Sequence, residues 1–283
     1  MILKRVGGKS KIADWIKFHM PAHRIFVDVF GGSGAVLNEM IGADNCRYVY
    51  NDLDNKLYAF FKVLQDRAPE LEDIVACTPY SRKFFEEAHS LLLDAEEFAK
   101  LDMLDQALAF LIVNRQSFGS KMTNTWSVAR EGEVVYETWS KVPELISQVS
   151  EKWRSVFLEN MDYQKILQKW DSDHTTFYLD PPYEGVESEY YAVNKESGFD
   201  HDQMFEALQG IDGSYMVSYY DGSIVERYRQ AGCHVVEQEV KIHIAREGKA
   251  TKTEVLIISE NEWAKHNRTS KAIKGRQAGD IFR

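Results

Sequence analysis

The sequence predicts an α/β fold with a doubly wound, mainly parallel sheet. The first observation is the apolar run Ile25–Phe30, which leads into glycines 31, 32 and 34 and then into the helical pattern Ala35–Ile41. This order is the strand, turn and helix that open a βαβ unit. The second observation is that strands and helices alternate again between residues 154 and 260. Both ends of the chain are therefore expected to contribute to one core.

The other core elements follow from the same patterns. The second strand, Arg47–Tyr50, precedes a helix that runs through Gln65, and later helices are expected at Tyr163–Trp170 and His201–Leu208. Short apolar runs between polar turns indicate the remaining strands. They are Val156–Met161, Thr176–Asp180, Tyr215–Tyr219, Val235–Val240 and Glu254–Ser259.

Residues 63–153 differ in character from this core. Charged amphipathic helices are expected at Ser81–Leu93, Ala95–Val113 and Pro143–Trp153, and residues 114–124 form a polar stretch. The segments Thr125–Arg130 and Val134–Trp139 alternate as strands do, with Gly132 in a turn between them. This pattern indicates a β-hairpin.

The length and composition fit one large globular unit with an insertion. The chain has 283 residues, of which 44% are hydrophobic, and this is enough to fill a sizeable core. We expect residues 63–153 to be inserted into a core made of residues 1–62 and 154–260. Residues 261–283 are expected to form a polar tail.

Two classes of protein are disfavoured. The longest apolar stretch, Ala107–Val113, is too short to cross a bilayer, and no apolar signal segment follows the start of the chain. We therefore expect a cytoplasmic protein with no membrane partner and no obligate protein partner. Cys46, Cys77 and Cys233 are widely spaced, so neither a disulfide framework nor a metal site is expected.

The charge distribution is uneven along the chain. The formal net charge is −10, yet residues 1–24 carry six basic and one acidic side chain and residues 241–283 carry ten and five. If both ends lie on one face, they could bind a polyanion, because phosphate neutralisation by Lys and Arg dominates nucleic-acid affinity. Solvated basic ends are the equal alternative.

The tetrapeptide Asp180-Pro181-Pro182-Tyr183 is the most informative motif. It ends an apolar strand, and ligands of open α/β sheets bind beyond the carboxyl ends of the strands. An ordinary strand-ending turn is the alternative. The segment Ser218-Tyr219-Tyr220-Asp221 follows another strand and is expected to line the same pocket, with a core role as the alternative for Tyr219.

This motif suits an amine whose lone pair is delocalised into an aromatic ring. The Asp180 carboxylate can accept one N–H of such an amine and the Pro181 carbonyl the other, which draws the nitrogen towards tetrahedral geometry. The adjacent Pro182 stiffens the backbone that holds this carbonyl. Tyr183 offers a flat face on which a base can stack after extrusion from a duplex.

The glycine turn indicates a nucleotide-like ligand with a carboxylate. Glycines at 31, 32 and 34 let the backbone approach a ligand closely, and the following helix N-terminus favours an anion. Asp52, at the end of the second strand, is placed to bind ribose hydroxyls. Leu37 occupies the third glycine position of the GxGxxG pattern, which disfavours a nicotinamide cofactor.

Together these motifs resemble those of the Dam-like, D12-class adenine-N6 DNA methyltransferases. The segment Lys4–Lys9 resembles the family's N-terminal cofactor motif, Phe26–Gly34 its cofactor loop, and Asn114–Phe118 its DNA-contacting loop. The resemblance covers most of the chain. It implies a Rossmann-like S-adenosylmethionine-dependent methyltransferase core with an inserted helical plus β-hairpin target-recognition lobe. It also implies methylation of N6 of a flipped adenine at specific sites in double-stranded DNA.

The resemblance implies roles for individual residues. Those expected to act on the target base are Asp180, Pro181, Pro182 and Tyr183. Those expected to bind S-adenosylmethionine are Gly8, Lys9, Asp28, Phe30, Gly31, Gly32, Gly34, Asp52, Asp162 and Asp180. A surface lysine is the alternative for Lys9, and a helix N-cap is the alternative for Asp162.

The same resemblance implies contacts with nucleic acid. The residues concerned are Lys4, Arg115, Phe118, Lys121, Arg130 and Arg246. Phe118 resembles the aromatic residue that fills the gap left by the flipped base, and Lys4 resembles a position that reads a base. Arg246 begins a basic loop expected at residues 246–252. Trp126 and Trp139 are interpreted as packing residues of the hairpin.

Several alternatives stay open at this point. The motif recognises an amino group, so adenine in RNA or N4 of cytosine could be the substrate. A non-catalytic nucleic-acid-binding protein with the same fold is an alternative of another class. Thr123 stands where GATC-specific members have a base-reading arginine, so the resemblance does not imply GATC specificity.

Overall fold

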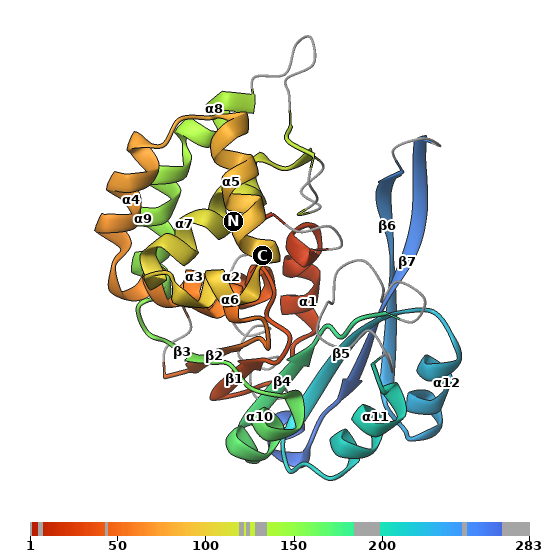
Figure 1. Cartoon of the computed structure of the whole chain (residues 1–283). Helices are drawn as coiled ribbons and strands as arrows, with labels where there is room; N and C mark the ends of the chain where they lie inside the picture. Colours follow the sequence, from red (N-terminus) through yellow and green to blue (C-terminus); the bar gives the residue numbers. More distant parts are fainter. Residues whose placement is uncertain are drawn as a thin grey trace, which may run out of the picture. The chain divides into compact units, whose positions relative to one another are not determined.

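The structure is a computed structural model that describes residues 2–4, 8–42, 45–118, 122, 125–127, 135–183, 199–244 and 248–267. The strands within these residues are β1 (Ile25–Asp28), β2 (Arg47–Asn51), β3 (Val156–Glu159), β4 (Thr175–Leu179), β5 (Ser214–Tyr220), β6 (His234–Ile244) and β7 (Gly248–Ser259). They form a seven-stranded sheet in the order β3-β2-β1-β4-β5-β7-β6 (Figure 1). β2–β3, β1–β4 and β4–β5 pair in parallel, whereas β7 is antiparallel to β5 and β6. The predicted α/β fold is confirmed.

The chain divides into two compact units, each assembled from separate segments. Unit 1 contains Met1–Lys17, Gly31–Ala43 and Tyr48–Met161, and unit 2 contains Phe18–Phe30, Asp44–Arg47 and Asp162–Arg283. The expected division into a core and an inserted lobe stays a prediction. In the described part of the chain, no helix combines the length and the apolar character needed to cross a bilayer.

Most of the helices before β3 lie in unit 1. After the 3-10 turn Lys9–Lys11 they are α1 (Ala13–His19), α2 (Ala35–Met40), α3 (Asn55–Asp66), α4 (Ala68–Cys77), α5 (Arg82–Leu93), α6 (Ala95–Lys100), α7 (Met103–Gln116), α8 (Val135–Ser140) and α9 (Val142–Trp153). α7 packs against α3 and α5 (Figure 1). Its residues Leu111 and Val113 are fully buried, so α7 is at the centre of this helical layer.

The structure corrects the helices expected at residues 95–124. The single helix Ala95–Val113 is two helices, because the Asp102 side chain accepts a hydrogen bond from the Leu104 N–H and begins a new helix, α7. α7 then continues to Gln116. Asn114 and Arg115, expected in a polar stretch, are therefore helical and buried.

The expected β-hairpin is wrong in its second strand. Residues expected as the strand Val134–Trp139 instead form α8 from residue 135 onwards. Trp139 is buried, as are Val142 and Ile146 at helical spacings of three and four residues, so they continue the apolar face of α9. In the first expected strand, Trp126 makes only an isolated bridge with Ser117, and residues 128–134 lie outside the described residues.

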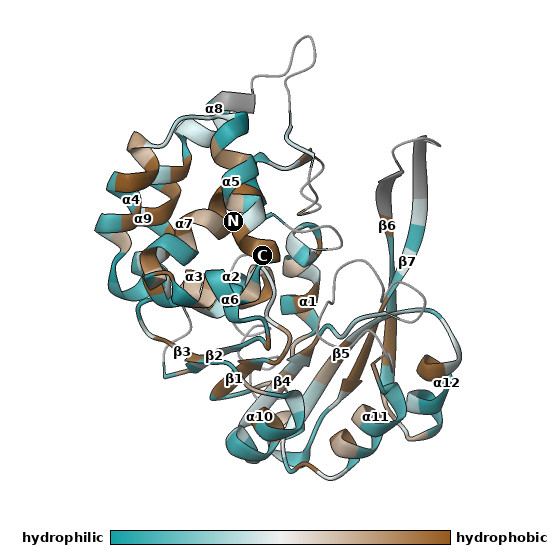
Figure 2. Ribbon diagram, viewed as in Figure 1, coloured by the Kyte–Doolittle hydropathy of each residue, from teal (hydrophilic) through white to brown (hydrophobic). Residues whose placement is uncertain are grey.

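The strands of unit 2 carry much of its core. β4 is buried at all five positions, and β5 at six of its seven. Figure 2 shows mixed hydropathy colours in these strands, because the buried positions include Thr, Ser and Tyr as well as Phe, Leu, Met and Val. The helices here are α10 (Tyr163–Trp170), α11 (His201–Gln209) and α12 (Ser223–Gln230). The first two were expected from the sequence, and α12 was not.

β6 and β7 extend beyond β5 as a two-stranded ribbon (Figure 1). β7 pairs with β5 only from Glu254 to Ser259, but it pairs with β6 as far as Gly248. The segment 246–252 was expected to be a loop, and this is wrong for residues 248–252, which belong to β7. Arg246 lies outside the described residues.

The beginning of the expected polar tail is packed onto unit 2. The Asn261 side chain donates hydrogen bonds to the carbonyl oxygens of Asp173 and Asp212, each at 2.8 Å. Ala264 is fully buried, and the Trp263 ring lies 4.6 Å from that of His174. Residues 268–283 lie outside the described residues.

Candidate active site

The DPPY tetrapeptide follows β4 directly, as predicted. The buried strand fixes where the backbone of Asp180 begins, and Pro181 is buried while Asp180 is half-buried. The Tyr183 hydroxyl donates a hydrogen bond to Asp180 Oδ1 over 2.9 Å. Burial, and after it the Asp180 carboxylate, hold the pKa of the Tyr183 phenol well above its ordinary value. The phenol therefore keeps its proton at neutral pH.

Sequence reasoning missed a second carboxylate beside this motif, that of Glu254. The Tyr183 hydroxyl also lies 2.9 Å from Glu254 Oε1. Glu254 is only 5% exposed, which is unusual for an ionisable side chain, and it pairs across the strands with Tyr220. The one signal in the sequence was an acidic residue at the head of the apolar run 255–258.

Aromatic rings pack around Tyr183. The Tyr220 ring lies 4.3 Å from it at an interplanar angle of 42°, and Lys252 Nζ lies 4.4 Å from the centre of the Tyr220 ring. Tyr219 is buried, and its hydroxyl pairs with His201 Nδ1 at 2.8 Å. The core role that was the alternative for Tyr219 is therefore correct, whereas Tyr220 lies against the DPPY motif.

Polar side chains are also buried in β4, which precedes the motif, and in the neighbouring strand β5. The Tyr178 hydroxyl lies 2.8 Å from Ser218 Oγ, and both residues are buried. Burial, and after it the charge of Asp180, raise the pKa of Tyr178 well above its ordinary value. Asp28, on β1, is 2% exposed and in register with Tyr178. This places Asp28 one strand away from the DPPY strand.

The other predicted cofactor residues of unit 2 include aromatic side chains. The Phe30 ring lies 6.0 Å from that of Tyr163 and 5.6 Å from that of Phe199. Asp162 begins α10, and its Oδ1 accepts the Gln164 N–H at 2.8 Å. Asp162 is therefore an N-cap, which was the alternative for this residue, and its position beside the aromatic group leaves the cofactor role as a prediction.

In unit 1 the glycine turn is held by its own backbone and by packing. The Gly31 N–H donates to Asn51 O at 2.8 Å, and the Tyr50 hydroxyl donates to Gly32 O at 2.7 Å. A Cβ on Gly31 would lie 2.2 Å from the Tyr50 ring, and one on Gly34, where φ is +72°, would lie 2.4 Å from Trp153. The absence of side chains here is therefore required by the fold as well as by any ligand.

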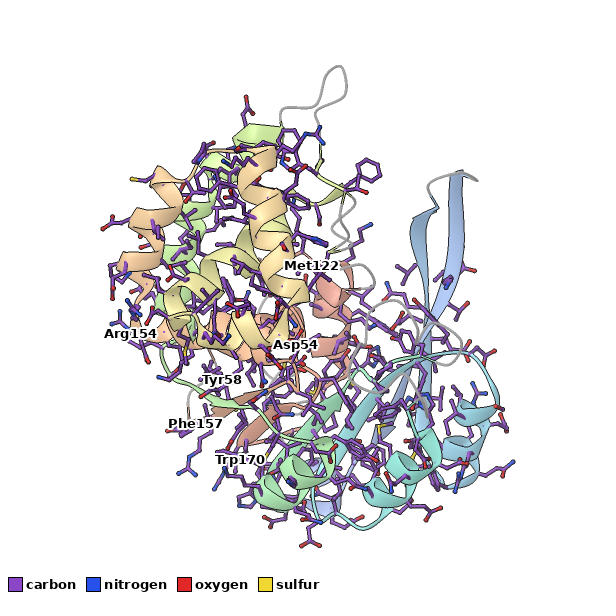
Figure 3. The ribbon with its side chains drawn as sticks, in the orientation of Figure 1. Asp54, Tyr58, Met122, Arg154, Phe157 and Trp170 are labelled. Carbon is purple, nitrogen blue, oxygen red and sulfur yellow. The ribbon has the colours of Figure 1, made fainter. Side chains whose placement is uncertain are left out.

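Asp52 is tied to this turn. Its Oδ2 accepts the Gly32 N–H at 2.8 Å, and its Oδ1 accepts the Asp54 N–H at 2.9 Å. Asp54 in turn caps α3, at whose start it is labelled in Figure 3. The Asp52 carboxylate therefore holds the glycine turn against the end of β2. This structural role of Asp52 was not predicted.

The N-terminal residues Gly8 and Lys9 belong to the same unit. Gly8 precedes the 3-10 turn in an extended conformation. Lys9 is 5% exposed, so the alternative of a surface lysine is wrong. In the described part of the chain, no group of three or more His, Cys, Asp or Glu side chains is placed to hold a metal ion.

Comparison with known proteins decides the family. The family model described as D12 class N6 adenine-specific DNA methyltransferase matches residues 6–242. The chain belongs to this family. It is therefore an adenine-specific DNA methyltransferase.

Named relatives of this D12-class enzyme agree. The chain is 26% identical to a DNA adenine methylase of Escherichia coli K12 in an alignment of 252 positions that covers 83% of this chain and 86% of the relative. It is 23% identical to the Retron Ec67 DNA adenine methylase of Escherichia coli, over 91% of this chain and 90% of the relative. A solved precorrin-6y C5,15-methyltransferase from Geobacter metallireducens GS-15 aligns with a TM-score of 0.41 and 10% identity, covering 92% of this chain and 91% of that one. That likeness is too distant to support a conclusion.

The D12-class enzyme holds Lys4 through Asn114. The Lys4 N–H donates to Asn114 Oδ1 at 2.9 Å, and Asn114 Nδ2 donates to Lys4 O at 2.8 Å. Asn114 Nδ2 also lies 3.6 Å from the sulfur of Met122, which Figure 3 labels. Burial, and after it the charge of Arg115, lower the pKa of Lys4. Asn114, which was expected in the DNA-contacting loop Asn114–Phe118, therefore holds the backbone of Lys4.

Arg115 has a different position from the one expected. It is 9% exposed, and its guanidinium donates to the carbonyl oxygens of Ile2 at 3.3 Å and Thr138 at 3.2 Å. It therefore ties the N-terminal segment and α8 to α7. These bonds engage the guanidinium inside the helical layer, where a DNA phosphate would not reach it.

Phe118 is exposed at the end of α7, as a wedge residue would need to be. Its side chain is 48% exposed, while its backbone N–H donates to Thr125 O at 2.8 Å. The Trp126 indole N–H donates to Gln116 Oε1 at 3.3 Å, and that of Trp139 donates to Thr78 O at 2.8 Å. Both tryptophans pack within unit 1, but they are not partners in a hairpin, because Trp139 belongs to α8. Lys121, Arg130, Thr123 and Arg246 lie outside the described residues.

Proposed function

We propose that this D12-class enzyme methylates N6 of an adenine flipped out of double-stranded DNA, and that Asp180 and Pro181 hold the amino group. The observation that carries this is the DPPY tetrapeptide at the end of a fully buried strand, with the Tyr183 hydroxyl bonded to Asp180. Asp180 would accept one N–H of the amine and the Pro181 carbonyl the other. These bonds direct the nitrogen lone pair towards the methyl donor.

Tyr183 would bind the extruded base by stacking. Its hydroxyl is anchored to carboxylates, so the plane of the ring is fixed by polar bonds as well as by packing against Tyr220. A fixed aromatic face reduces the entropy lost when a flipped base binds. Pro182 would keep the backbone between Pro181 and Tyr183 stiff.

The residues present fit S-adenosylmethionine as the methyl donor. When bound, it supplies an electrophilic methyl group on a sulfonium. In unit 1, Gly31, Gly32 and Gly34 form a side-chain-free turn before α2, and the buried Lys9 and Gly8 suit a carboxylate. Asp52, whose carboxylate accepts the Gly32 and Asp54 N–H groups, would also accept from the ribose hydroxyls.

In unit 2, Asp162 and the aromatic group around Phe30 suit a purine ring. Phe30, Tyr163 and Phe199 are apolar surfaces, and Asp162 beside them can accept from an amino group. Asp28, a buried carboxylate one strand from the motif, is assigned to the same cofactor. Asp180 would contact the target base and also the cofactor, but the affinity for the cofactor would rest mainly on the other residues.

For DNA, we propose that the region of residues 63–153 recognises the target. Phe118 is exposed and its backbone N–H is bonded to Thr125 O, so its side chain can enter the gap left by the base. Lys4, whose backbone Asn114 fixes, would read a base edge. Lys121, Arg130 and Arg246 would contact phosphates.

The test combines a product assay with a binding assay. Double-stranded DNA, single-stranded DNA and RNA are incubated with the enzyme and methyl-labelled S-adenosylmethionine, and the modified nucleoside is identified by mass. Asp180→Asn should lower the single-turnover rate on duplex DNA by at least about 100-fold, with cofactor affinity within about threefold of wild type. The control Asp73→Asn, at an exposed position on α4, should behave as wild type. Wild-type turnover by Asp180→Asn, or a label on any base other than adenine, would contradict the proposal.

A further inference from the structure

The Glu254 carboxylate is a second hydrogen-bond acceptor for the hydroxyl of Tyr183, the residue that we propose stacks on the target base. We propose that Glu254 is a positioning residue that keeps the Tyr183 hydroxyl from occupying Asp180. The inference rests on the proposed function of Asp180 and Tyr183. Its basis is a phenol oxygen that lies 2.9 Å from Asp180 Oδ1 and also 2.9 Å from Glu254 Oε1.

The fold gives Glu254 a fixed position. It pairs with Tyr220 across the antiparallel strands β5 and β7, so both side chains lie on the same face of the sheet. The Tyr220 ring in turn packs at 4.3 Å on Tyr183. Within β7, the residues after Glu254 are buried from Val255 to Ile258, so the backbone that carries this carboxylate has little freedom to move.

A phenol has one proton, and this limits what Tyr183 can do. It donates fully to one carboxylate at a time. When it donates to Asp180, the acceptor strength of that carboxylate for a substrate amine falls. When it donates to Glu254, it no longer competes with the amine for Asp180 Oδ1, while the ring of Tyr183 stays in place. Glu254 therefore acts through Tyr183 and touches neither substrate.

A double-mutant cycle tests this coupling, because only a residue acting through Tyr183 loses its effect when the hydroxyl is absent. Glu254→Ala should lower the single-turnover methylation rate on duplex DNA roughly tenfold. The KM for DNA and the affinity for S-adenosylmethionine, measured by titration, should change by less than about threefold. In a Tyr183→Phe background, Glu254→Ala should change the rate by less than about twofold.

Further variants separate positioning from folding. Glu254→Gln keeps an acceptor oxygen and should restore most of the wild-type rate. Glu254→Met fills the same volume without an acceptor, and it serves in the same cycle if the alanine variant does not fold. The control Glu237→Ala removes an exposed glutamate of β6 whose partner on β7 is Val255, which places it on the opposite face from Glu254. It should match wild type.

The outcomes are distinct. An equal loss of rate from Glu254→Ala in both backgrounds, or no loss in either, would overturn the coupling of Glu254 to Tyr183. A failure of the wild-type enzyme to methylate adenine would instead overturn the proposed function. A tenfold loss that disappears in the Tyr183→Phe background supports the inference.

Discussion

Gly34 lies in the turn that we propose binds the cofactor, and its backbone also packs against the core. One substitution there therefore tests both the stability of the fold and the binding of the cofactor. The φ of +72° at Gly34 costs a residue with a Cβ roughly 1–2 kcal/mol. The added Cβ would lie 2.4 Å from Trp153. That ring is fully buried, stacks on Phe61 with centroids 4.2 Å apart and donates to Asn38 Oδ1 at 3.2 Å. Overpacking of this kind costs roughly 1–3 kcal/mol, so Gly34→Ala should lower the free energy of unfolding by about 2–5 kcal/mol.

Urea unfolding followed by circular dichroism measures this loss, and Gly232 provides the matched control. Gly232 has a similar φ of +86°, but no atom lies within 4 Å of the place that an alanine Cβ would take there, so Gly232→Ala should lose only about 1–2 kcal/mol. The difference between the variants is the cost of displacing Trp153. Gly34→Ala should also weaken S-adenosylmethionine binding, and Gly232→Ala should not. Equal losses of stability would refute the packing argument.

Three further outcomes are expected from the structure. Asn114→Ala removes both bonds to the Lys4 backbone and should weaken binding to methylatable duplex DNA roughly tenfold, measured by fluorescence anisotropy; unchanged affinity would contradict the role given to Asn114. Phe118→Ala should change the free energy of unfolding by less than about 0.5 kcal/mol because the ring is exposed, yet lower the methylation rate, and a matching loss of stability would make Phe118 a packing residue. Burial, and then the charge of Asp162, raise the pKa of Tyr163 from 10.0 to about 12. A raised pKa stabilises the fold below the unfolded value, so this contribution is complete below pH 10 and is lost between pH 10 and 12; Tyr163→Phe should remove that part of the pH dependence of the thermal midpoint.

Much of the α/β core could be predicted from sequence because its signals are local. The helix expected at Tyr163–Trp170 has those same bounds in the structure. The DPPY motif was placed correctly because an apolar strand precedes it, and strand ends of open sheets bind ligands. In both cases the periodicity and the turn residues lie within a few positions of each other.

The remainder depends on contacts between distant residues. The strand expected at Val134–Trp139 is helix α8 because Trp139 packs with the face of α9. Arg115 looked like a phosphate contact until its bonds to Ile2 and Thr138, at sequence separations of 113 and 23, showed it inside the helical layer. Glu254 lies 71 residues from Tyr183, so no local pattern could join them.

The pairing of β1 with β4 has a consequence for synthesis on the ribosome. Ile25 of β1 pairs with Thr175 of β4. The ribosome must therefore add 150 further residues after Ile25 before this partner has been synthesised. At about 5–20 residues per second, the delay is roughly 8–30 s. During that time the apolar segment Phe26–Val29 lacks its β4 neighbour. Slow codons or weak chaperone capacity during synthesis of residues 30 to 175 should therefore reduce the yield of active enzyme more than equal delays near the C-terminus.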